Sequence, residues 1–478
     1  MADHDELSGR GAGAGPGGTG SEGLDRRTVL KLFGAGALGV GAASALSSLG
    51  ASGAASAAGA ATRERDVSAA PAATGGQILI GYITPLTGPL APFSQSDSYI
   101  LKKIRATSAY KKGMTVGGKK YSVKIVVKDS QSTPNRAAQV AQQLAQGTKV
   151  DMIVTANAPE TVNPVATAAQ QYQVPSLATV CPWESWYAGL GGNPGKPTTT
   201  FQYCSLFFFG MKEFAGTFLP MWERIQKKTG ADKVFAGAYP NDADGNAFRA
   251  GFPPYAEKLG YKFVTGGAYE DGQTNYTSMI QKFKSANCQF FSNAPLPPTF
   301  NTFWKQAITQ GYKPKLATVA KVLLFPSTMT ALGQLAVNIA TDAWWTPFSP
   351  YKSSLSGETT TSLAKGWQNT SGKLWWQSLG SCYSLFEVAK EAFTAVDTPH
   401  DHAQVADALH KVNYSGMCGP INFAKGPAPG VGIILPVGVQ WRKGKTILGK
   451  KFPWEPFVVD NSLNKHVKIT GDLEVGTY

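Results

Sequence analysis

Few residues of this chain could perform covalent or metal chemistry, and their spacing does not assemble a catalytic centre. His400 and His402 flank Asp401 and could touch a metal ion, but no third ligand stands at a suitable spacing, and a solvated helix start explains the pair as well. The carboxylates Asp242 and Asp244 lie in loop-like sequence without the spacing evidence that glycoside hydrolysis requires. No Walker A, His-Glu-x-x-His or Gly-x-Ser-x-Gly motif occurs. We therefore expect no enzymatic activity, no metal site and no cofactor.

The glycine spacing at 34–39 matches a dinucleotide-binding fingerprint formally, but it follows no predicted strand. It lies in an apolar Gly/Ala run that comes after residues 25–31, DRRTVLK, and this arginine pair resembles the address of the twin-arginine export system. The glycines dilute the run too much for a permanent membrane span, and Ala55-Ser56-Ala57 fits a cleavage site. We predict a twin-arginine signal peptide over 1–57, a Gly/Ala/Ser-rich linker over 58–76, and a periplasmic or extracellular protein that can associate with the cell envelope.

Charge and cysteine usage narrow the partners of the exported part. The formal net charge is +14, but the lysines and arginines are scattered and form no arginine-rich strip, so we expect no nucleic-acid partner. An exported protein with five cysteines can hold two disulfides, for which Cys181–Cys204 and Cys382–Cys418 are the first pairings to test. No Cys-x-x-Cys motif is present, which argues against a redox centre or a zinc knuckle.

From Gln77 onward, short apolar runs alternate with longer segments of helical periodicity. Thr133 and Pro134 form a typical helix start, with threonine as N-cap and proline at the first helical position. The predicted strands are 78–83, 121–127, 152–154, 174–180, 233–239, 261–268 and 288–293, and the predicted helices include 162–172, 210–229, 245–259, 274–285 and 299–310. This alternation indicates an α/β protein with two doubly wound parallel sheets and a ligand cleft at the carboxyl ends of their strands.

The order of short motifs resembles the type I periplasmic solute-binding proteins of the branched-chain amino acid/amide ABC transporter family. The motifs are IGYITPLTG at 80–88, KDS at 128–130, the Asn241-Asp242 pair, Tyr276-Thr277 and Gly419-Pro420. The resemblance implies two lobes joined by three hinge crossovers near 203–207, 343–348 and 440–445. Lobe I would comprise 77–204 and 345–440, lobe II would comprise 205–344, and 441–478 would return through the hinge and pack near lobe II.

The same resemblance implies a function without catalysis. Such a protein closes its lobes on a small solute and delivers the solute to the permease and ATPase of an ABC importer. A monomer is expected. A sensory module that signals through a partner protein is the alternative, because the same fold supports both uses. An envelope hydrolase is a third interpretation, which the missing catalytic motifs disfavour.

The family resemblance places two ligand-carboxylate loops at 157–161 and 179–183, and the hydroxyl group expected in each loop is lost. The two positions fall at about Ala158 or Pro159 and near Val180 or Cys181, while the acidic group for a ligand ammonium falls at Lys321. These departures argue against an ordinary α-amino acid and favour an anionic or aromatic carboxylate. Lys321 could instead pair with a nearby aspartate or point to water.

Further ligand contacts are implied by the same register, each with a structural alternative. The aromatic side chains Phe93, Trp183 and Phe208 could wall the pocket or could simply pack in the core or hinge. Asp244 stands at an aromatic contact position of the family, or it caps a helix. The expected ligand-binding set is Phe93, Ala158, Pro159, Thr161, Thr179, Cys181, Trp183, Phe208, Asp244, Asn293 and Lys321.

Overall fold

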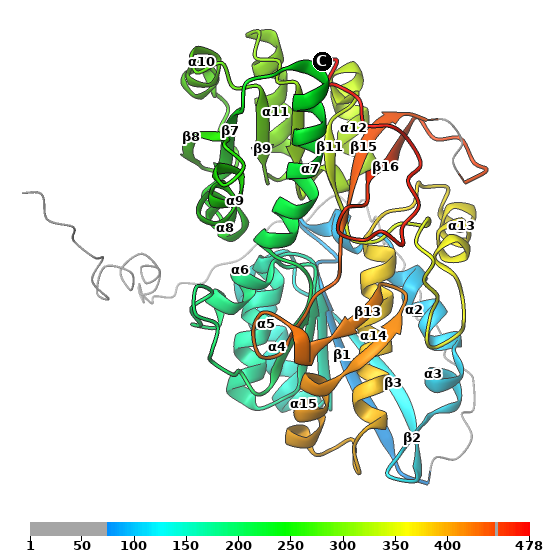
Figure 1. Cartoon of the computed structure of the whole chain (residues 1–478). Helices are drawn as coiled ribbons and strands as arrows, with labels where there is room; N and C mark the ends of the chain where they lie inside the picture. Colours follow the sequence, from blue (N-terminus) through cyan, green and yellow to red (C-terminus); the bar gives the residue numbers. More distant parts are fainter. Residues whose placement is uncertain (1–73, 445–447) are drawn as a thin grey trace, which may run out of the picture. The chain divides into compact units, whose positions relative to one another are not determined.

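The computed structural model describes residues 74–444 and 448–478, so the predicted signal peptide and nearly all of the predicted linker lie outside the described residues. The described chain builds two seven-stranded sheets and a small hairpin. The strands and the helices that connect them can be followed in Figure 1. In both large sheets most neighbouring strands are parallel, and helices connect them. The predicted α/β class with two doubly wound sheets is confirmed. Among the described residues, no helix combines the length and apolarity that crossing a membrane requires.

The first sheet has the strand order β14-β6-β5-β4-β1-β3-β2. All its pairings are parallel except the β2–β3 hairpin. Its strands are β1 (Gln77–Thr84), β2 (Met114–Val116), β3 (Lys119–Asp129), β4 (Met152–Ala156), β5 (Ser176–Thr179), β6 (Cys204–Phe207) and β14 (Val431–Gly432). Its helices are η1 (Ala91–Ser94), α2 (Asp97–Ala106), α3 (Ser108–Lys112), α4 (Pro134–Gln142), the π-helical η2 (Gln143–Thr148), α5 (Pro159–Tyr172), α6 (Trp183–Gly189), α13 (Thr360–Ser371), α14 (Ser378–Thr394), α15 (His402–Lys411) and η5 (Phe423–Lys425). The hairpin β12 (Asn413–Gly416) and β13 (Gly419–Asn422) contacts α14.

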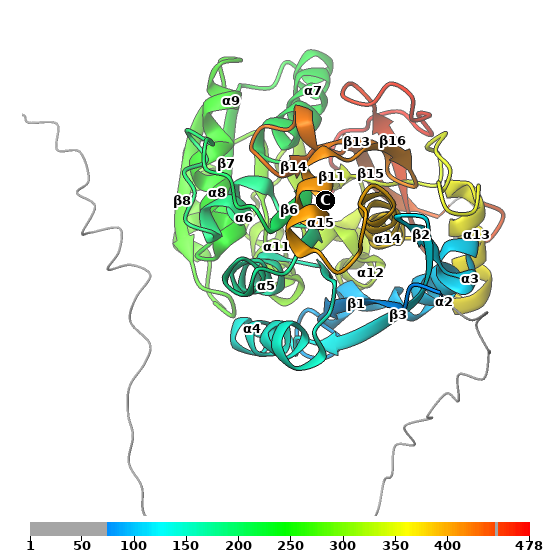
Figure 2. The same ribbon diagram turned by 90° about the horizontal axis from the view of Figure 1, so that it is seen from below.

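The alternation of side chains along β1 explains why helices cover both faces of this sheet. Ile78, Ile80 and Tyr82 belong to the apolar cluster that includes side chains of α2 and α14, whereas Ile83 belongs to the cluster formed with α4 and α5. The two layers of helices can be followed in Figure 2. The predicted start of α4 is confirmed, since the Thr133 hydroxyl accepts a hydrogen bond from the backbone N–H of Arg136 at 3.3 Å.

The second sheet has the order β16-β15-β11-β10-β9-β7-β8, parallel from β8 to β11 and antiparallel at β15 and β16. Its strands are β7 (Val234–Pro240), β8 (Lys262–Tyr269), β9 (Phe290–Asn293), β10 (Leu316–Val319), β11 (Ala340–Ala343), β15 (Val437–Lys443) and β16 (Trp454–Asp460). Its helices are α7 (Met211–Thr229), α8 (Ala243–Gly251), α9 (Pro253–Glu257), α10 (Thr277–Ser285), α11 (Pro297–Thr309), η3 (Val322–Leu324), α12 (Pro326–Leu332) and η4 (Gly333–Ala336).

We call the first sheet with its helices lobe I (77–207 and 360–432) and the second sheet with its helices lobe II (211–343 and 437–460). The described chain passes between the sheets three times: after β6, after β11 and after β14. The third passage differs from the expected one near 440–445, because Val437 already pairs with Ala343 in lobe II. The segment expected to belong to lobe I until 440 therefore ends before 437.

The end of the chain packs on lobe II. The Tyr478 ring meets the ring of Trp304 edge-on at 4.8 Å between centroids, and its hydroxyl accepts a hydrogen bond from the N–H of Ala317 at 3.2 Å.

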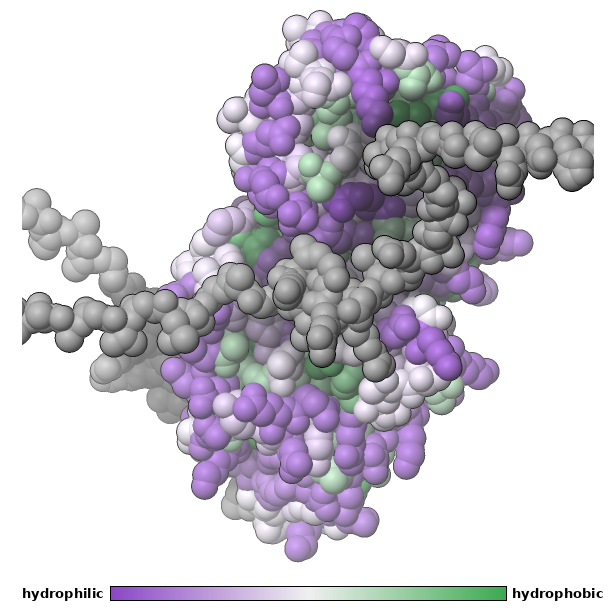
Figure 3. Space-filling model, turned by 90° about the vertical axis from the view of Figure 1, so that its left-hand side faces the viewer, coloured by the Kyte–Doolittle hydropathy of each residue, from purple (hydrophilic) through white to green (hydrophobic). Residues whose placement is uncertain are grey.

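The face of the molecule in Figure 3 is largely hydrophilic with scattered apolar patches. Large hydrophobic side chains that are exposed come from separate segments, namely Leu86, Leu259, Leu435 and Ile469.

Candidate functional site

A small cavity lies where loops after the strands of both sheets meet, as expected for open parallel sheets. Its volume is about 40 Å³, little more than a single water occupies in the liquid. Lobe I and the passage after β6 contribute Phe93, Ala158, Val180, Pro182 and Phe208; lobe II and the passage after β11 contribute Phe214, Asp244, Phe248, Ala294, Ala320, Lys321, Leu324, Asp342 and Trp344. A solute of organic size therefore requires the two lobes to part or the lining side chains to move.

Three residues on the wall of this cavity have a backbone conformation with positive φ. Ala158 has φ 77° and ψ 150°, Lys321 has φ 62° and ψ −73°, and Val180 has φ 57°. A β-branched residue at positive φ is a true outlier, and each such residue costs roughly 1–3 kcal/mol of conformational energy. The loops are held in place by hydrogen bonds, because the N–H of Ala158 donates to the carbonyl of Val180 at 3.1 Å. Such strain is typical of sites that hold backbone or side chains ready for a ligand.

Lys321 is the centre of an ion cluster that joins the two lobes. Its Nζ lies 2.8 Å from Asp244 Oδ2 and 3.5 Å from both Asp242 Oδ2 and Glu160 Oε1. Asp242 and Asp244 stand at the start of α8 in lobe II, whereas Glu160 belongs to the first turn of α5 in lobe I. Of the two alternatives for Lys321, the pairing with nearby aspartates is the one observed.

Burial and charge act in opposite directions on this cluster. Burial opposes the positive charge of Lys321, but the carboxylates of Asp244, Glu160 and Asp242 outweigh it and raise the lysine pKa well above its usual value. Burial raises the pKa of Asp244 to about 6, although Lys321 opposes this rise. Lys321 is therefore a firmly charged ammonium that is already occupied by carboxylates.

The cluster contains three carboxyl groups and one lysine, so some carboxyl oxygens have no hydrogen-bond donor in the described part of the chain. Asp244 Oδ1, Asp242 Oδ2 and Glu160 Oε2 are buried atoms with no hydrogen-bond partner among the described residues. Asp271 stands near enough that Asp242 raises its pKa further, after burial as the main cause. The lobe II side of the cavity is thus rich in negative charge.

Asp342 is a second buried acid on the cavity wall, and sequence reasoning did not find it. Its side chain is 1 % exposed, and its Oδ1 accepts a hydrogen bond from the Thr341 hydroxyl at 3.3 Å. It forms no ion pair with any residue in 74–444 or 448–478. Burial raises the pKa of Asp342 to about 7. A signal existed in the sequence, since a charged residue interrupts the short apolar run 339–345.

The expected ligand-binding residues divide into two groups. Those on the cavity wall are Phe93, Ala158, Phe208, Asp244 and Lys321. Those not on the wall are Pro159, Thr161, Thr179, Cys181, Trp183 and Asn293.

The polar members of the second group have partners inside lobe I or lobe II. The Thr179 hydroxyl donates to the Phe207 carbonyl at 2.8 Å, and the Thr161 hydroxyl contacts that of Ser130 at 3.1 Å. Asn293 accepts a hydrogen bond from the Tyr269 hydroxyl at 3.2 Å. Of the aromatic residues on the wall, Phe214, Phe248 and Trp344 were not expected. Their positions depend on how α7, α8 and the passage after β11 pack, which local sequence patterns do not reveal.

The cysteine pairings expected from the sequence are wrong for this structure. All five cysteines lie among the described residues as buried free thiols, so neither Cys181–Cys204 nor Cys382–Cys418 is bonded. The thiols are directed to other partners instead. Cys204 donates to the carbonyl of Ala166 at 3.2 Å, and Cys181 lies 3.7 Å from Asn163 Oδ1.

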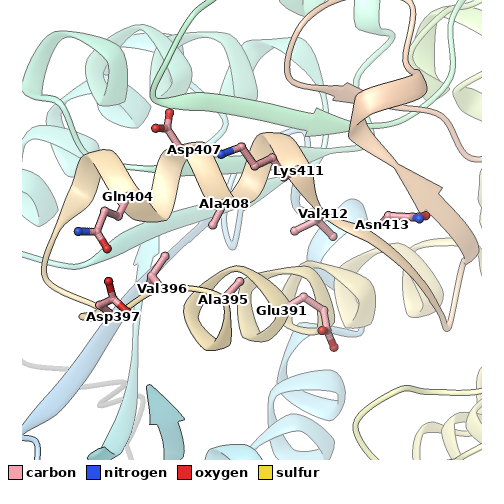
Figure 4. A pocket seen from close by; sticks show the side chains of 10 residues that line it. All are labelled: Glu391, Ala395, Val396, Asp397, Gln404, Asp407, Ala408, Lys411, Val412 and Asn413. Carbon is pink, nitrogen blue, oxygen red and sulfur yellow. The ribbon is translucent and has the colours of Figure 1, made fainter. Parts of the chain in front are cut away.

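Two other polar regions are surface features of lobe I. His400 pairs with Asp151 at 2.7 Å and His402 contacts the Gln173 carbonyl, and no group of metal-binding side chains occurs in the part of the chain that the structure describes. A hollow of about 430 Å³ lies between α14 and α15 (Figure 4). It is lined by Glu391, Ala395, Val396, Asp397, Gln404, Asp407, Ala408, Lys411, Val412 and Asn413. Because it belongs to one lobe, its shape need not change when the lobes move.

Comparisons with known proteins agree with this architecture. A family model described as "Periplasmic binding protein" matches residues 77–429. The leucine-binding protein LivK of Thermotoga maritima superposes with a TM-score of 0.60 at 18% identity, covering 76% of this chain and 95% of that one. LivJ of Streptococcus pneumoniae in complex with isoleucine gives 0.59 at 14% identity, with 80% and 99% covered. A solute-binding protein of an ABC transporter from Rhodopseudomonas palustris BisB5, in complex with 3,4-dihydroxybenzoic acid, gives 0.60 at 16% identity, with 80% and 98% covered.

Proposed function

The chain belongs to the periplasmic binding protein family, and from this membership we propose that it is the extracytoplasmic solute receptor of an ABC importer. The observation that carries the proposal is the cavity that both lobes build together. A solute that contacts both lobes binds the closed form more tightly than the open form and so shifts the population toward closure. The receptor does no chemistry on its cargo, and it acts as a monomer that delivers the cargo to the permease and ATPase.

The cavity wall supports a solute with an apolar or aromatic body. Aromatic side chains come from lobe I at Phe93, from the passage after β6 at Phe208, and from lobe II at Phe214 and Phe248. Phe93 also meets Phe325 of lobe II edge-on at 4.8 Å, so aromatic contacts already cross between the lobes. Amino acids and aromatic carboxylates, the classes bound by the similar proteins above, are therefore the first solutes to test. We propose Phe93, Ala158, Phe208, Asp244 and Lys321 as ligand contacts.

A binding screen tests the receptor function. The secreted form is purified without denaturation, examined by native mass spectrometry for bound solute, and melted in the presence of a broad metabolite panel. At least one small solute should raise the melting temperature, because a ligand present at 100 times its Kd stabilises the folded state by about 2.7 kcal/mol. The function is refuted if no solute is retained and no compound shifts melting.

A pair of matched variants connects the screen to the cavity. Phe93→Ala should weaken binding of the identified solute by roughly 1.5–3 kcal/mol, the value of one large apolar side chain. Leu259→Ala, which removes an exposed side chain of lobe II, should leave affinity unchanged. Equal effects of the two variants would place the binding site elsewhere.

Export by the twin-arginine route belongs to the same proposal, on the evidence of the sequence 25–31. Replacing Arg26 and Arg27 together by lysine keeps the positive charge and removes the arginine pair. We expect the doubly substituted full chain to stay in the cytoplasm while the parent chain is recovered outside it. Cell fractionation followed by immunoblotting measures the difference, and equal export of both chains would exclude this route.

A further inference from the structure

The cavity wall holds hydrogen-bond acceptors and carries almost no available donors. Its carboxyl groups are Asp244 and Asp342, and no lining residue is a serine, threonine, tyrosine, asparagine, glutamine, histidine or arginine. The side-chain donors on the wall are Lys321 and Trp344. Trp344 Nε1 already donates to the Ser381 hydroxyl at 3.3 Å, and Lys321 is held by three carboxylates. Lys321 Nζ forms no hydrogen bond among the described residues, so it is the single side-chain donor on the wall that a solute could engage, and the solute would compete there with three carboxylates.

Resting on the proposed receptor function, we propose that the solute carries a cationic amine, received by Asp342 and Asp244, on an apolar or aromatic body. The ammonium of the solute would provide a cationic partner for Asp342, which has no ion pair in the described part of the chain, and for Asp244, which shares Lys321 with two other carboxylates. The aromatic side chains around them then enclose the remainder of the solute. A carboxylate on the solute is not required and is not favoured.

Asp342 gives the strongest support for this assignment. A carboxyl group that is withdrawn from water normally has a cation or several donors, because an isolated buried charge is costly. Asp342 accepts hydrogen bonds from the Thr341 hydroxyl at 3.3 Å and from its own backbone N–H, and it has no ion pair within the described residues. It lines the cavity, so a ligand can reach it. An ammonium is the simplest group that satisfies it, since it brings both charge and donors.

Asp244 supports the assignment independently, because it lies in the first turn of α8 and not on β11. Its Oδ2 is bound to Lys321, but its Oδ1 is buried and has no hydrogen-bond partner among the described residues. Asp244 also lines the cavity. The surrounding charge is negative, because Lys321 stands alone against the carboxyl groups of Glu160, Asp242 and Asp244.

An anionic solute would meet the opposite situation. To use Lys321 it would have to approach an ammonium that already lies within ion-pair distance of three carboxylates, and its negative charge would be repelled by theirs. It would also add a negative charge beside Asp342. The favoured solutes are therefore amines, and an amine-free aromatic carboxylate is disfavoured.

Matched amine and acid probes with the same body test the charge preference. The pairs are tyramine with 4-hydroxyphenylacetate, 2-phenylethylamine with 3-phenylpropionate, and isoamylamine with isovalerate, with leucine and phenylalanine beside them. Calorimetry and melting are run on the purified exported protein, and native mass spectrometry identifies any solute retained from the cell. We expect amines to bind at least tenfold tighter than their acid partners, and any retained solute to contain an amine.

Carboxamide variants locate the ammonium. Asp342→Asn and Asp244→Asn should each weaken binding of the best amine by about tenfold or more, because each removes a charged acceptor for the ammonium. Asp407→Asn, which removes the same charge at the groove between α14 and α15, should have no effect. Melting curves without ligand show that each variant is folded.

The possible outcomes separate the two proposals. Tighter binding of the acids, or a retained solute without an amine, overturns the amine assignment and leaves the receptor function standing. Amine binding that survives both carboxamide variants also overturns it. If neither amines nor acids bind while another solute of the wider screen does, the assignment fails and the receptor remains. If nothing binds and nothing is retained, the receptor function itself fails.

Discussion

Glu387 of lobe I and Asp342 of lobe II are equally buried acids that differ in their hydrogen-bond partners. Glu387 on α14 of lobe I is fully buried, yet it accepts hydrogen bonds from the N–H groups of Ser354 and Met417 at 2.7 and 2.8 Å. It also accepts from the hydroxyls of Ser384 and Tyr414 at 2.9 and 3.3 Å. Asp342 is buried to the same degree, and its donors are the Thr341 hydroxyl at 3.3 Å and its own backbone N–H.

Burial raises the pKa of both groups, so a raised pKa does not distinguish them. The number of donors around each carboxyl group does. The first acid organises the loop at 353–358 and the β12–β13 turn around α14, and its partners are complete without a ligand. The second lies on a cavity wall with its partners incomplete. Incomplete hydrogen bonding, rather than burial, is thus the property that indicates a ligand-facing acid.

Removing the complete network should give the largest loss of stability. Glu387→Ala leaves several buried donors without an acceptor, and we expect the free energy of unfolding to fall by about 3 kcal/mol or more. Urea unfolding followed by tryptophan fluorescence measures this change. Glu391→Ala on the same helix, where the carboxylate pairs with Lys390, should change stability by less than about 0.5 kcal/mol. If Glu387→Ala changed the free energy of unfolding as little as Glu391→Ala, the hydrogen bonds of Glu387 would not be structural and the two acids would not differ.

The incomplete site should respond in the opposite direction. Asp342→Asn removes a poorly compensated buried charge, and at pH 8 we expect the ligand-free protein to gain about 1–2 kcal/mol of stability. The same urea experiment measures it. A loss of stability comparable with that of Glu387→Ala would mean that the Asp342 carboxylate has structural partners after all.

The pH dependence of stability sharpens this contrast. The folded-state pKa of Asp342, about 7, lies above its ordinary value of 3.8, so between these values the folded state binds the proton more tightly. The group therefore contributes stability below pH 4 that is lost as the pH rises to about 7. Asp97 and Glu184, with pKa values also raised to about 7 by burial, act with the same sign. The stability gain from Asp342→Asn should hence be near zero at pH 4 and largest above pH 7.

The smallest expected effect concerns the strained backbone beside the cavity. Ala158→Gly removes the side chain from φ 77°, and we expect a gain of about 1 kcal/mol in the free energy of unfolding. Ala166→Gly, inside α5, should lose about 1 kcal/mol. Thermal unfolding of the two variants side by side measures the difference. Losses of equal size would indicate that the loop at 158 carries no strain.

The fold could be predicted from the sequence because its periodicities are local. Apolar runs of strand length that are separated by helical patterns predict parallel sheets. The start of α4 is predicted by two adjacent residues, Thr133 as N-cap and Pro134 at the first helical position. The third passage between the lobes was predicted at the wrong position because it depends on strand pairing, which is not local. Residues 437–443 alternate like any half-buried strand, and only their pairing with β11 shows which sheet they join.

The site could be predicted in part. Lys321 and Asp244 were found because they follow strand ends at positions that the family motif fixes, and the structure places both on the cavity wall. The preference for an anionic solute was drawn from Lys321 alone, since the sequence does not show that Asp242, Asp244 and Glu160 converge on it. Asp342 was missed because it lies within a strand, β11, rather than in a loop.

The free thiols have a consequence for how this protein matures. Since all five cysteines are reduced and enclosed in the core, no step of folding waits for an oxidant or for a disulfide isomerase. The native state can therefore form in the reducing cytosol, which the proposed twin-arginine route would require of a protein that is exported folded. Material produced in an ordinary cytosolic host should match the exported protein in stability, with or without a reducing agent.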